Sequence, residues 1–227
     1  MSLPFPARLR AVLFDWDGTL VDSADLSFRC YVTVFTRFGV AFDRDAYART
    51  YSPDWYSTYR LLGLDEACWP EADRLWREHY AGTGAHLLPG ALASLERLAG
   101  AGLALGIVSS GERERVGREH RALGLGDFFA TLVCGGDTER RKPHPEPLQV
   151  ALERMRVAPA EAAYVGDSPE DIQMARATGV YAVGIPGGFP NQDALRRSAP
   201  ELWAEDLADA AERLLASAAG TAGASRS

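Results

Sequence analysis

Five short apolar runs recur along the chain, each bounded by glycine, aspartate or serine, at residues 11–14, 103–108, 131–134, 162–165 and 180–185. Nearly continuous apolar runs of this length are typical of strands covered on both faces, as in a parallel sheet. Amphipathic helical segments lie between the later runs, at residues 91–102, 112–126, 145–159 and 168–179. This alternation predicts an α/β fold with a doubly wound, Rossmann-like parallel sheet.

One interval interrupts the alternation, because about 88 residues separate the first run from the second. A single crossover helix needs little more than about a dozen residues. Residues 21–88 also hold 13 of the 22 aromatic residues, without strand-like alternation. We therefore expect an inserted all-helical cap whose core is built mostly from these aromatics. The predicted division is an α/β catalytic core at residues 1–20 and 89–220, a helical cap at 21–88, and a flexible C-terminal tail at 216–227.

Charge and cysteine content exclude several classes of protein. The formal net charge is −7, with 23 arginines and one lysine, Lys142, which argues against a general nucleic-acid binder. Three widely spaced cysteines, Cys30, Cys68 and Cys134, fit neither a disulfide framework nor a zinc site. No apolar run approaches the ~18 residues of a membrane span, and the N-terminus lacks the apolar stretch of a secretory signal. We expect a soluble, cytoplasmic protein with neither a nucleic-acid nor a membrane partner.

Polar residues follow the apolar runs, at the sheet edge where ligands bind in open α/β folds. Asp15 and Asp17 come directly after the first run, and two carboxylates two residues apart point to the same side of an extended chain. One of them can attack a substrate while the other handles protons. Gly18 follows and permits a sharp turn.

Three further elements supply complementary charges. Ser109 and Ser110 after the second run offer hydroxyls and amides to an anion. Lys142 contributes a positive charge, and the acidic segment 167–171 suits a hard divalent cation. An anion binder, a cation and carboxylates, each at a predicted strand end, together predict a catalytic site.

The four motifs are DWDGTLVDS at 15–23, IVSSG at 107–111, KPHP at 142–145 and VGDSPEDI at 165–172. In this order they resemble the haloacid dehalogenase superfamily, in particular its phosphatases with a helical cap after the first motif. Phosphoglycolate phosphatases and their near relatives are the members that the chain resembles most. The resemblance covers about residues 9–190.

The resemblance implies a mechanism through an aspartyl-phosphate. Asp15 would be the nucleophile, and Asp17 would protonate the leaving alcohol and then deprotonate the hydrolytic water. Because Asp17 must first be protonated, we expect its neighbours to raise its pKa. Ser109 and the amide of Ser110 would hold the phosphoryl oxygens, and Lys142 would neutralise charge.

The same resemblance implies a Mg²⁺ ion bound by the Asp15 carboxylate, the Asp17 backbone carbonyl and Asp167. Asp171 would lie behind these ligands, either through water or as a partner of Lys142. Amides near Gly18 and Thr19 are expected to help bind phosphate. The chain is thus expected to be a Mg²⁺-dependent phosphomonoester hydrolase, monomeric or homodimeric, that acts on a small phosphorylated metabolite such as phosphoglycolate.

Single residues separate the alternatives within the superfamily. Dehalogenases lack the second carboxylate of the first motif, so Asp17 disfavours that reaction, and phosphonatases need a cap lysine, which residues 21–88 do not contain. β-Phosphoglucomutase-like members carry a histidine at the position of Ser27. This mutase reading stays open, as does a catalytically silent or receiver-like phospho-aspartate signalling protein. In receivers, however, the lysine follows the last strand, whereas Lys142 precedes the fourth run.

The cap is expected to choose the substrate. The segment from Tyr51 to Tyr56 resembles a loop between cap helices, with Arg49 and Arg60 on either side. Either arginine could meet a substrate carboxylate or simply lie in solvent. Whether these residues set specificity stays open.

Overall fold

The computed structural model describes residues 2–52, 55–81, 84–126 and 128–224. Within these residues, six strands form one parallel sheet in the order β3-β2-β1-β4-β5-β6. Their bounds are β1 Ala11–Phe14, β2 Ala104–Glu112, β3 Phe129–Gly135, β4 Ala162–Gly166, β5 Tyr181–Gly184 and β6 Leu202–Trp203. The order reverses between β1 and β4, which in doubly wound sheets is where ligands bind. The predicted fold class is confirmed.

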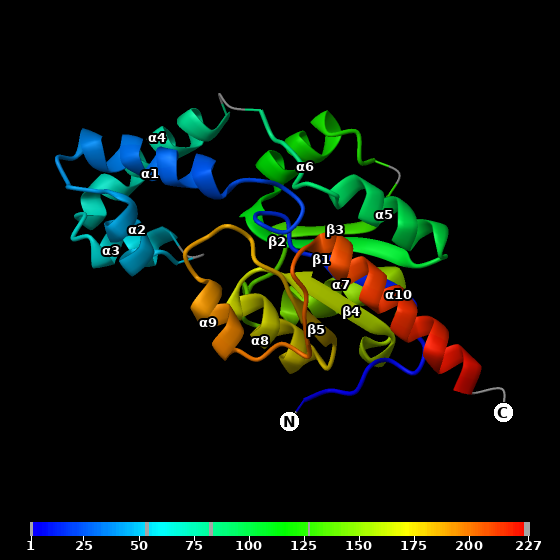
Figure 1. The fold of residues 1–227 in the computed structure, drawn as a ribbon. Coiled ribbons are helices and arrows are strands. Elements are labelled where there is room, and N and C mark those ends of the chain that lie inside the picture. Colours follow the sequence, from blue (N-terminus) through cyan, green and yellow to red (C-terminus); the bar gives the residue numbers. More distant parts are fainter. Residues whose placement is uncertain (1, 53–54, 82–83, 127, 225–227) are drawn as a thin grey trace.

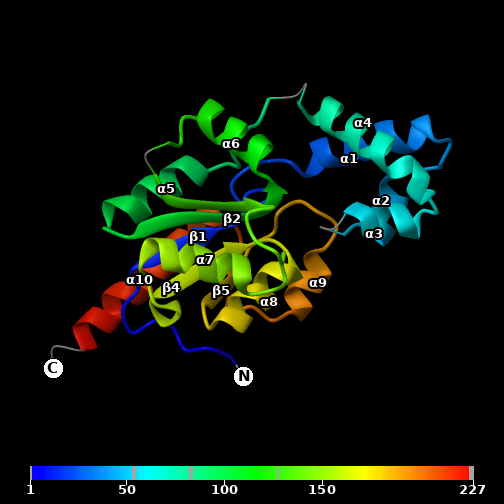
Figure 2. The same cartoon turned by 180° about the vertical axis from the view of Figure 1, so that it is seen from behind.

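Helices cover both faces of the sheet (Figures 1 and 2). Alternate residues of β1 enter two separate cores, with Val12 and Phe14 in one and Leu13 in the other. The first core also contains residues of α5 (Ala91–Gly100), α6 (Arg113–Ala122) and α10 (Leu207–Ala224). The second contains residues of α7 (Glu146–Met155), α8 (Pro169–Thr178) and α9 (Gln192–Arg197). A short 3₁₀ turn, η2 (Pro159–Glu161), leads into β4.

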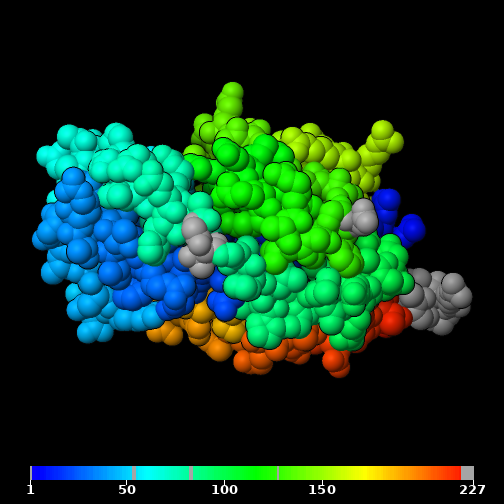
Figure 3. Space-filling view, turned by 90° about the horizontal axis from the view of Figure 1, so that it is seen from above, coloured from blue at the N-terminus to red at the C-terminus, as the bar shows by residue number. Residues whose placement is uncertain are grey.

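The inserted segment is helical, as predicted, and we call its elements the helical cap: α1 (Ala24–Arg37), α2 (Arg44–Thr50), α3 (Trp55–Leu61), the 3₁₀ turn η1 (Glu66–Cys68) and α4 (Trp69–Ala81). They form a separate lobe beside the sheet (Figures 1 and 3). Its core is largely aromatic, with Tyr31, Phe35 and Tyr59 buried at its centre. The two segments that connect the cap to the core lie side by side, and the Asp22 amide donates a hydrogen bond to the His86 carbonyl (2.9 Å). The exact boundaries at 20/21 and 88/89 stay predictions.

The structure differs from the sequence-based expectation at three places. Strand β2 continues through Glu112, so Ser109 and Ser110 lie within its carboxyl end rather than after it. Trp55 and Tyr56 belong to α3 and are not part of a loop, while Pro53 and Asp54 of that predicted loop lie outside the described residues. Helix α10 runs to Ala224, so residues 216–224 of the predicted tail are helical rather than irregular, and the flexibility of the tail stays a prediction. Residues 225–227 of that tail lie outside the described residues.

Among the residues that the structure describes, none of the helices combines the length and the apolar character needed to cross a membrane.

Candidate active site

The first motif makes a tight turn directly after β1. The Asp15 amide donates to the Val165 carbonyl of β4 (2.9 Å), which extends the strand pairing by one residue. The chain then turns back, and the Leu20 amide donates a hydrogen bond to the Trp16 carbonyl (3.0 Å). Gly18 sits in this turn at φ +75°, and a Cβ there would overlap the Asp167 carboxylate. Glycine is therefore required at this position both for its conformation and for its lack of a side chain.

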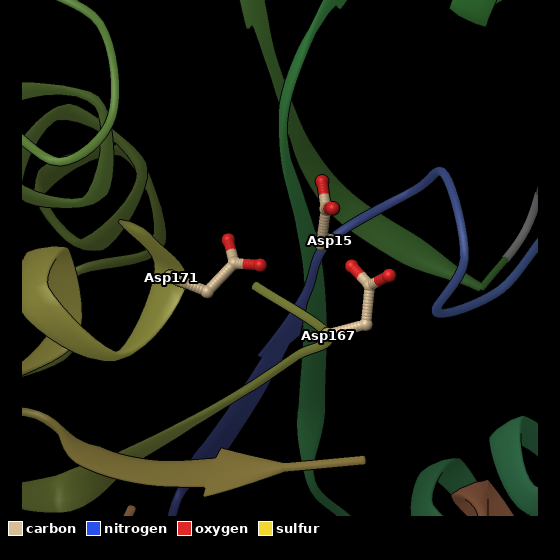
Figure 4. Close-up of side chains that lie close together, drawn as sticks. All are labelled: Asp15, Asp167 and Asp171. Atoms are coloured by element: carbon tan, nitrogen blue, oxygen red, sulfur yellow. The ribbon is translucent and has the colours of Figure 1, made fainter. Parts of the chain in front are cut away.

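Three buried carboxyl groups gather at the ends of β1 and β4 (Figure 4). Asp15, Asp167 and Asp171 each offer one oxygen, and these oxygens lie within 4.8 Å of one another. Burial raises the pKa of Asp15 to about 7, although Lys142 opposes this shift. Burial and the neighbouring Asp15 raise the pKa of Asp167 well above its usual range.

This cluster fits a hard divalent cation. Asp167 is 3% exposed, and its Oδ2 is a buried atom without a hydrogen-bond partner. A Cβ at Gly187 would overlap the same carboxylate, so the glycine leaves room for this group and its surroundings. Carboxylate oxygens are the ligands that Mg²⁺ prefers, and a bound cation would relieve the cost of burying like charges.

Lys142 bridges two of the carboxylates. Its Nζ donates to Asp15 Oδ1 (2.8 Å) and Asp171 Oδ1 (2.7 Å), and its side chain is only 5% exposed. The sequence left Asp171 either behind the metal ligands through water or as a partner of Lys142, and the structure shows the direct contact with Lys142. Asp171 is itself held by the Ser168 hydroxyl and amide in a capping box at the start of α8, and the Tyr164 hydroxyl lies 3.2 Å from its Oδ1. The ammonium group is thus fixed against the proposed nucleophile.

The environment of Asp17 contradicts one expectation. Burial raises the pKa of Asp17, but the charge and hydrogen bonds of Arg115, together with hydrogen bonds from Ser23 and Tyr80, outweigh burial, so the pKa is lowered rather than raised. Arg115 Nη2 lies 2.5 Å from Asp17 Oδ2, and the Tyr80 hydroxyl of the cap donates to Oδ1 (3.3 Å). Arg115 also pairs with Glu119, which accepts a hydrogen bond from Trp16 Nε1 (2.7 Å). These contacts favour the ionised form of Asp17 and tie it to α6 and the cap.

A cavity of about 420 Å³ brings the predicted catalytic residues together. Its lining includes Asp15, Asp17, Ser109, Ser110, Lys142 and Asp167. The Ser109 hydroxyl accepts a hydrogen bond from the Gly111 amide (3.0 Å), which fixes the end of β2. Gly18 and Thr19, which were expected to help bind phosphate, are not among the described residues that line this cavity.

The cap residues that line this cavity differ in part from those that the sequence suggests. Tyr51, Ser52 and Trp55 line it, but Arg49 and Arg60 do not. Arg60 is exposed, and its guanidinium lies 4.9 Å from the centre of the Trp69 ring. Sequence reasoning missed several lining residues, among them Trp76, Arg115, Arg141 and Phe189. Arg141 adjoins the KPHP motif, but the other three had no local signal.

A doubly wound sheet with an inserted helical cap and a lysine-bridged carboxylate cluster at its strand ends defines a class of capped, Rossmann-like enzymes. Comparison of the sequence with known protein families identifies the family, because residues 12–185 match the haloacid dehalogenase-like hydrolases. The chain belongs to this family and is an enzyme of the hydrolase class.

Individual relatives agree with this assignment. The phosphoglycolate phosphatase of Escherichia coli (strain K12) is 31% identical over 231 residues, covering 88% of this chain and 90% of the relative. The pyrophosphatase PpaX of Oceanobacillus iheyensis is 28% identical over 207 residues, covering 88% and 94%. A solved haloacid dehalogenase-like hydrolase from Streptococcus pneumoniae superposes with a TM-score of 0.78 at 26% identity, covering 89% of this chain and 96% of that one.

Proposed function

We propose that the protein is a Mg²⁺-dependent phosphatase that hydrolyses a small phosphomonoester through an aspartyl-phosphate. The observation that carries this proposal is Lys142 held between Asp15 and Asp171 beside the buried Asp167 carboxylate. A carboxylate that attacks a phosphate dianion meets like-charge repulsion, and this arrangement supplies positive charge where the repulsion arises. The phosphatase names of the relatives support the same reaction.

In the first step, Asp15 attacks phosphorus while the bond to the leaving oxygen breaks, and Ser109 and Ser110 hold the phosphoryl oxygens. Lys142 neutralises charge on Asp15 and the phosphoryl group. A Mg²⁺ ion would be held by Asp15, the Asp17 backbone carbonyl and Asp167, and would supply charge neutralisation and substrate orientation. Phosphate binding by amides near Gly18 and Thr19 remains a prediction.

Asp17 is proposed to transfer the protons. As an ionised group it is suited to accept a proton from the water that hydrolyses the intermediate. To protonate the leaving alcohol, Asp17 must first separate from Arg115, which keeps it ionised, and take up a proton from solvent.

The mutase alternative is disfavoured by Ser27. This residue lines the catalytic cavity and is 8% exposed, at the position where the mutase-like members carry a histidine. A receiver-like function is disfavoured because Lys142 precedes β4 and because a helical cap covers the site. The cytoplasmic location, the absence of nucleic-acid and membrane partners, and a monomeric or homodimeric state remain predictions.

The test is phosphate release from phosphoglycolate, inorganic pyrophosphate and a panel of phosphorylated metabolites, with Mg²⁺ and with EDTA. Phosphoglycolate and pyrophosphate come first because the relatives' names point to them. We expect Mg²⁺-dependent release that Asp15→Asn abolishes and that Asp45→Asn, a change to an exposed cap carboxylate, leaves intact. Failure of every ester to release phosphate with Mg²⁺ would overturn the proposal.

A further inference from the structure

A second cavity, of about 260 Å³, lies where the helical cap meets the core. Its lining comes from α3 and α4 of the cap and from the β2–α6 segment of the core. Trp55, Trp76 and Arg115 line both this cavity and the catalytic one. A substrate whose phosphate lies at Asp15 could therefore place its organic part beside or beyond these three side chains. We call this second space the aromatic cavity.

Aromatic rings form much of its wall, namely those of Trp55, Tyr59, Trp76 and Tyr80. The Trp76 and Tyr80 rings are stacked, with centres 4.7 Å apart and planes 20° apart. The Trp55 and Trp76 planes are within 17° of each other, with centres 6.5 Å apart. Near-parallel faces of this kind favour a flat ring that can stack on them. A cavity of about 150 Å³ already accommodates benzene in another protein, so this one has room for a substituted ring.

Several polar atoms of the wall are buried without hydrogen-bond partners. They are the indole nitrogens of Trp55 and Trp76, the Tyr59 hydroxyl and Asp73 Oδ1. Burial raises the pKa of Tyr59, and the nearby Asp73 carboxyl adds to this rise. Buried polar atoms in folded proteins are normally paired. Four such atoms therefore lie in residues that line this one cavity.

The charges around the aromatic cavity do not favour an anionic guest. Its lining has four acidic residues and three arginines: Asp73, Glu78, Glu112, Glu114, Arg77, Arg115 and Arg118. Arg77 pairs with Glu112 across the two lobes (3.1 Å), and Arg115 pairs with Asp17 and Glu119. Two of the three arginines are therefore already paired, and the four acidic residues outnumber the arginines, so a carboxylate on the substrate would gain little here. An uncharged ring suits this space better.

We propose that the aromatic cavity binds the alcohol part of the substrate, and that this part carries an aromatic ring. This inference rests on the proposed phosphatase function and names the class of ester that the site prefers. The two-carbon acid of phosphoglycolate would leave the cavity unfilled.

Benzyl phosphate and ethyl phosphate test the proposal, since their alcohols are of similar acidity and differ mainly in the ring. We expect kcat/KM to be about tenfold or more higher for benzyl phosphate. Trp55→Leu and Trp76→Leu should each bring the benzyl-to-ethyl ratio towards one. Trp69→Leu is the matched control, because this cap residue stacks on Tyr56 and lines neither cavity, so the ratio should persist. Thermal melts verify that each variant is folded.

Binding gives a comparison that does not depend on turnover. Calorimetry on the Asp15→Asn protein with Mg²⁺ should show benzyl phosphate bound about tenfold or more tightly than ethyl phosphate. Equal binding and equal kcat/KM for the two esters would overturn the aromatic preference while leaving the phosphatase proposal intact. A ratio that persists in both Trp55→Leu and Trp76→Leu would place the ring elsewhere and likewise refute this cavity. Tight benzyl binding without hydrolysis of any ester would contradict the phosphatase function instead.

Discussion

The buried carboxyl of Asp15 makes the stability of the metal-free protein depend on pH in an unusual direction. Burial raises the pKa of this group from 3.8 to about 7, so between these values the folded protein holds a proton that the unfolded chain has released. The free energy of unfolding must then fall as the pH rises through this window. A pKa shift of this size corresponds to about 4 kcal/mol of the free energy of unfolding. About 3 kcal/mol of this is lost between about pH 4.5 and 7.5.

The assay is urea unfolding in EDTA at these two pH values, with the wild type and Asp15→Asn compared. The variant lacks the titrating group, so the difference between the two proteins reports the titration of Asp15 together with its coupling to Asp167, whose pKa Asp15 also raises. We expect the wild type to lose about 3 kcal/mol more than the variant on going to the higher pH. Mg²⁺ added there should restore stability to the wild type. Equal losses in both proteins, or a wild type that gains stability as the pH rises, would refute the reasoning.

Three substitutions test the surroundings of this group. Lys142→Arg should lower kcat at least about 100-fold, because a planar guanidinium cannot replace a compact ammonium in a position this buried; near-normal turnover would show that charge alone suffices. Gly187→Ala should raise the Mg²⁺ concentration for half-maximal activity, because the new methyl group displaces the Asp167 carboxylate; an unchanged requirement would contradict that ligand. Tyr164→Phe should lower the free energy of unfolding by about 1–3 kcal/mol in urea titrations, because its hydroxyl donates a 2.8 Å bond to a β2 carbonyl; unaltered stability would contradict the value of that bond.

Most of the fold could be predicted from the sequence because its signals are local. A strand buried on both faces, such as β1, must be apolar throughout, and that pattern can be read directly. The insertion was recognisable because its length and aromatic content differ from those of a crossover helix. By contrast, β6 has two residues and α9 has six, which is too short for a periodic pattern.

The residues of the candidate site likewise divide into those that a local motif marks and those that only the folded structure brings in. The carboxylates and Lys142 could be named because each lies in a motif at a predicted strand end. Arg115 could not, since it meets Asp17 across 98 residues of chain, and nothing local distinguishes it among 23 arginines. The expectation of a raised pKa for Asp17 was wrong for this reason. Trp76 and Phe189 reach the cavity only through the packing of the cap against the core.

The central claim is that Asp15 carries the phosphoryl group during turnover. Rapid acid quenching of the enzyme with substrate and Mg²⁺, followed by mass spectrometry of the peptides, measures this directly. We predict one added phosphoryl group on the peptide that contains Asp15, and none in Asp15→Asn. Turnover without that modification, or a phosphorylated residue elsewhere, would contradict the account.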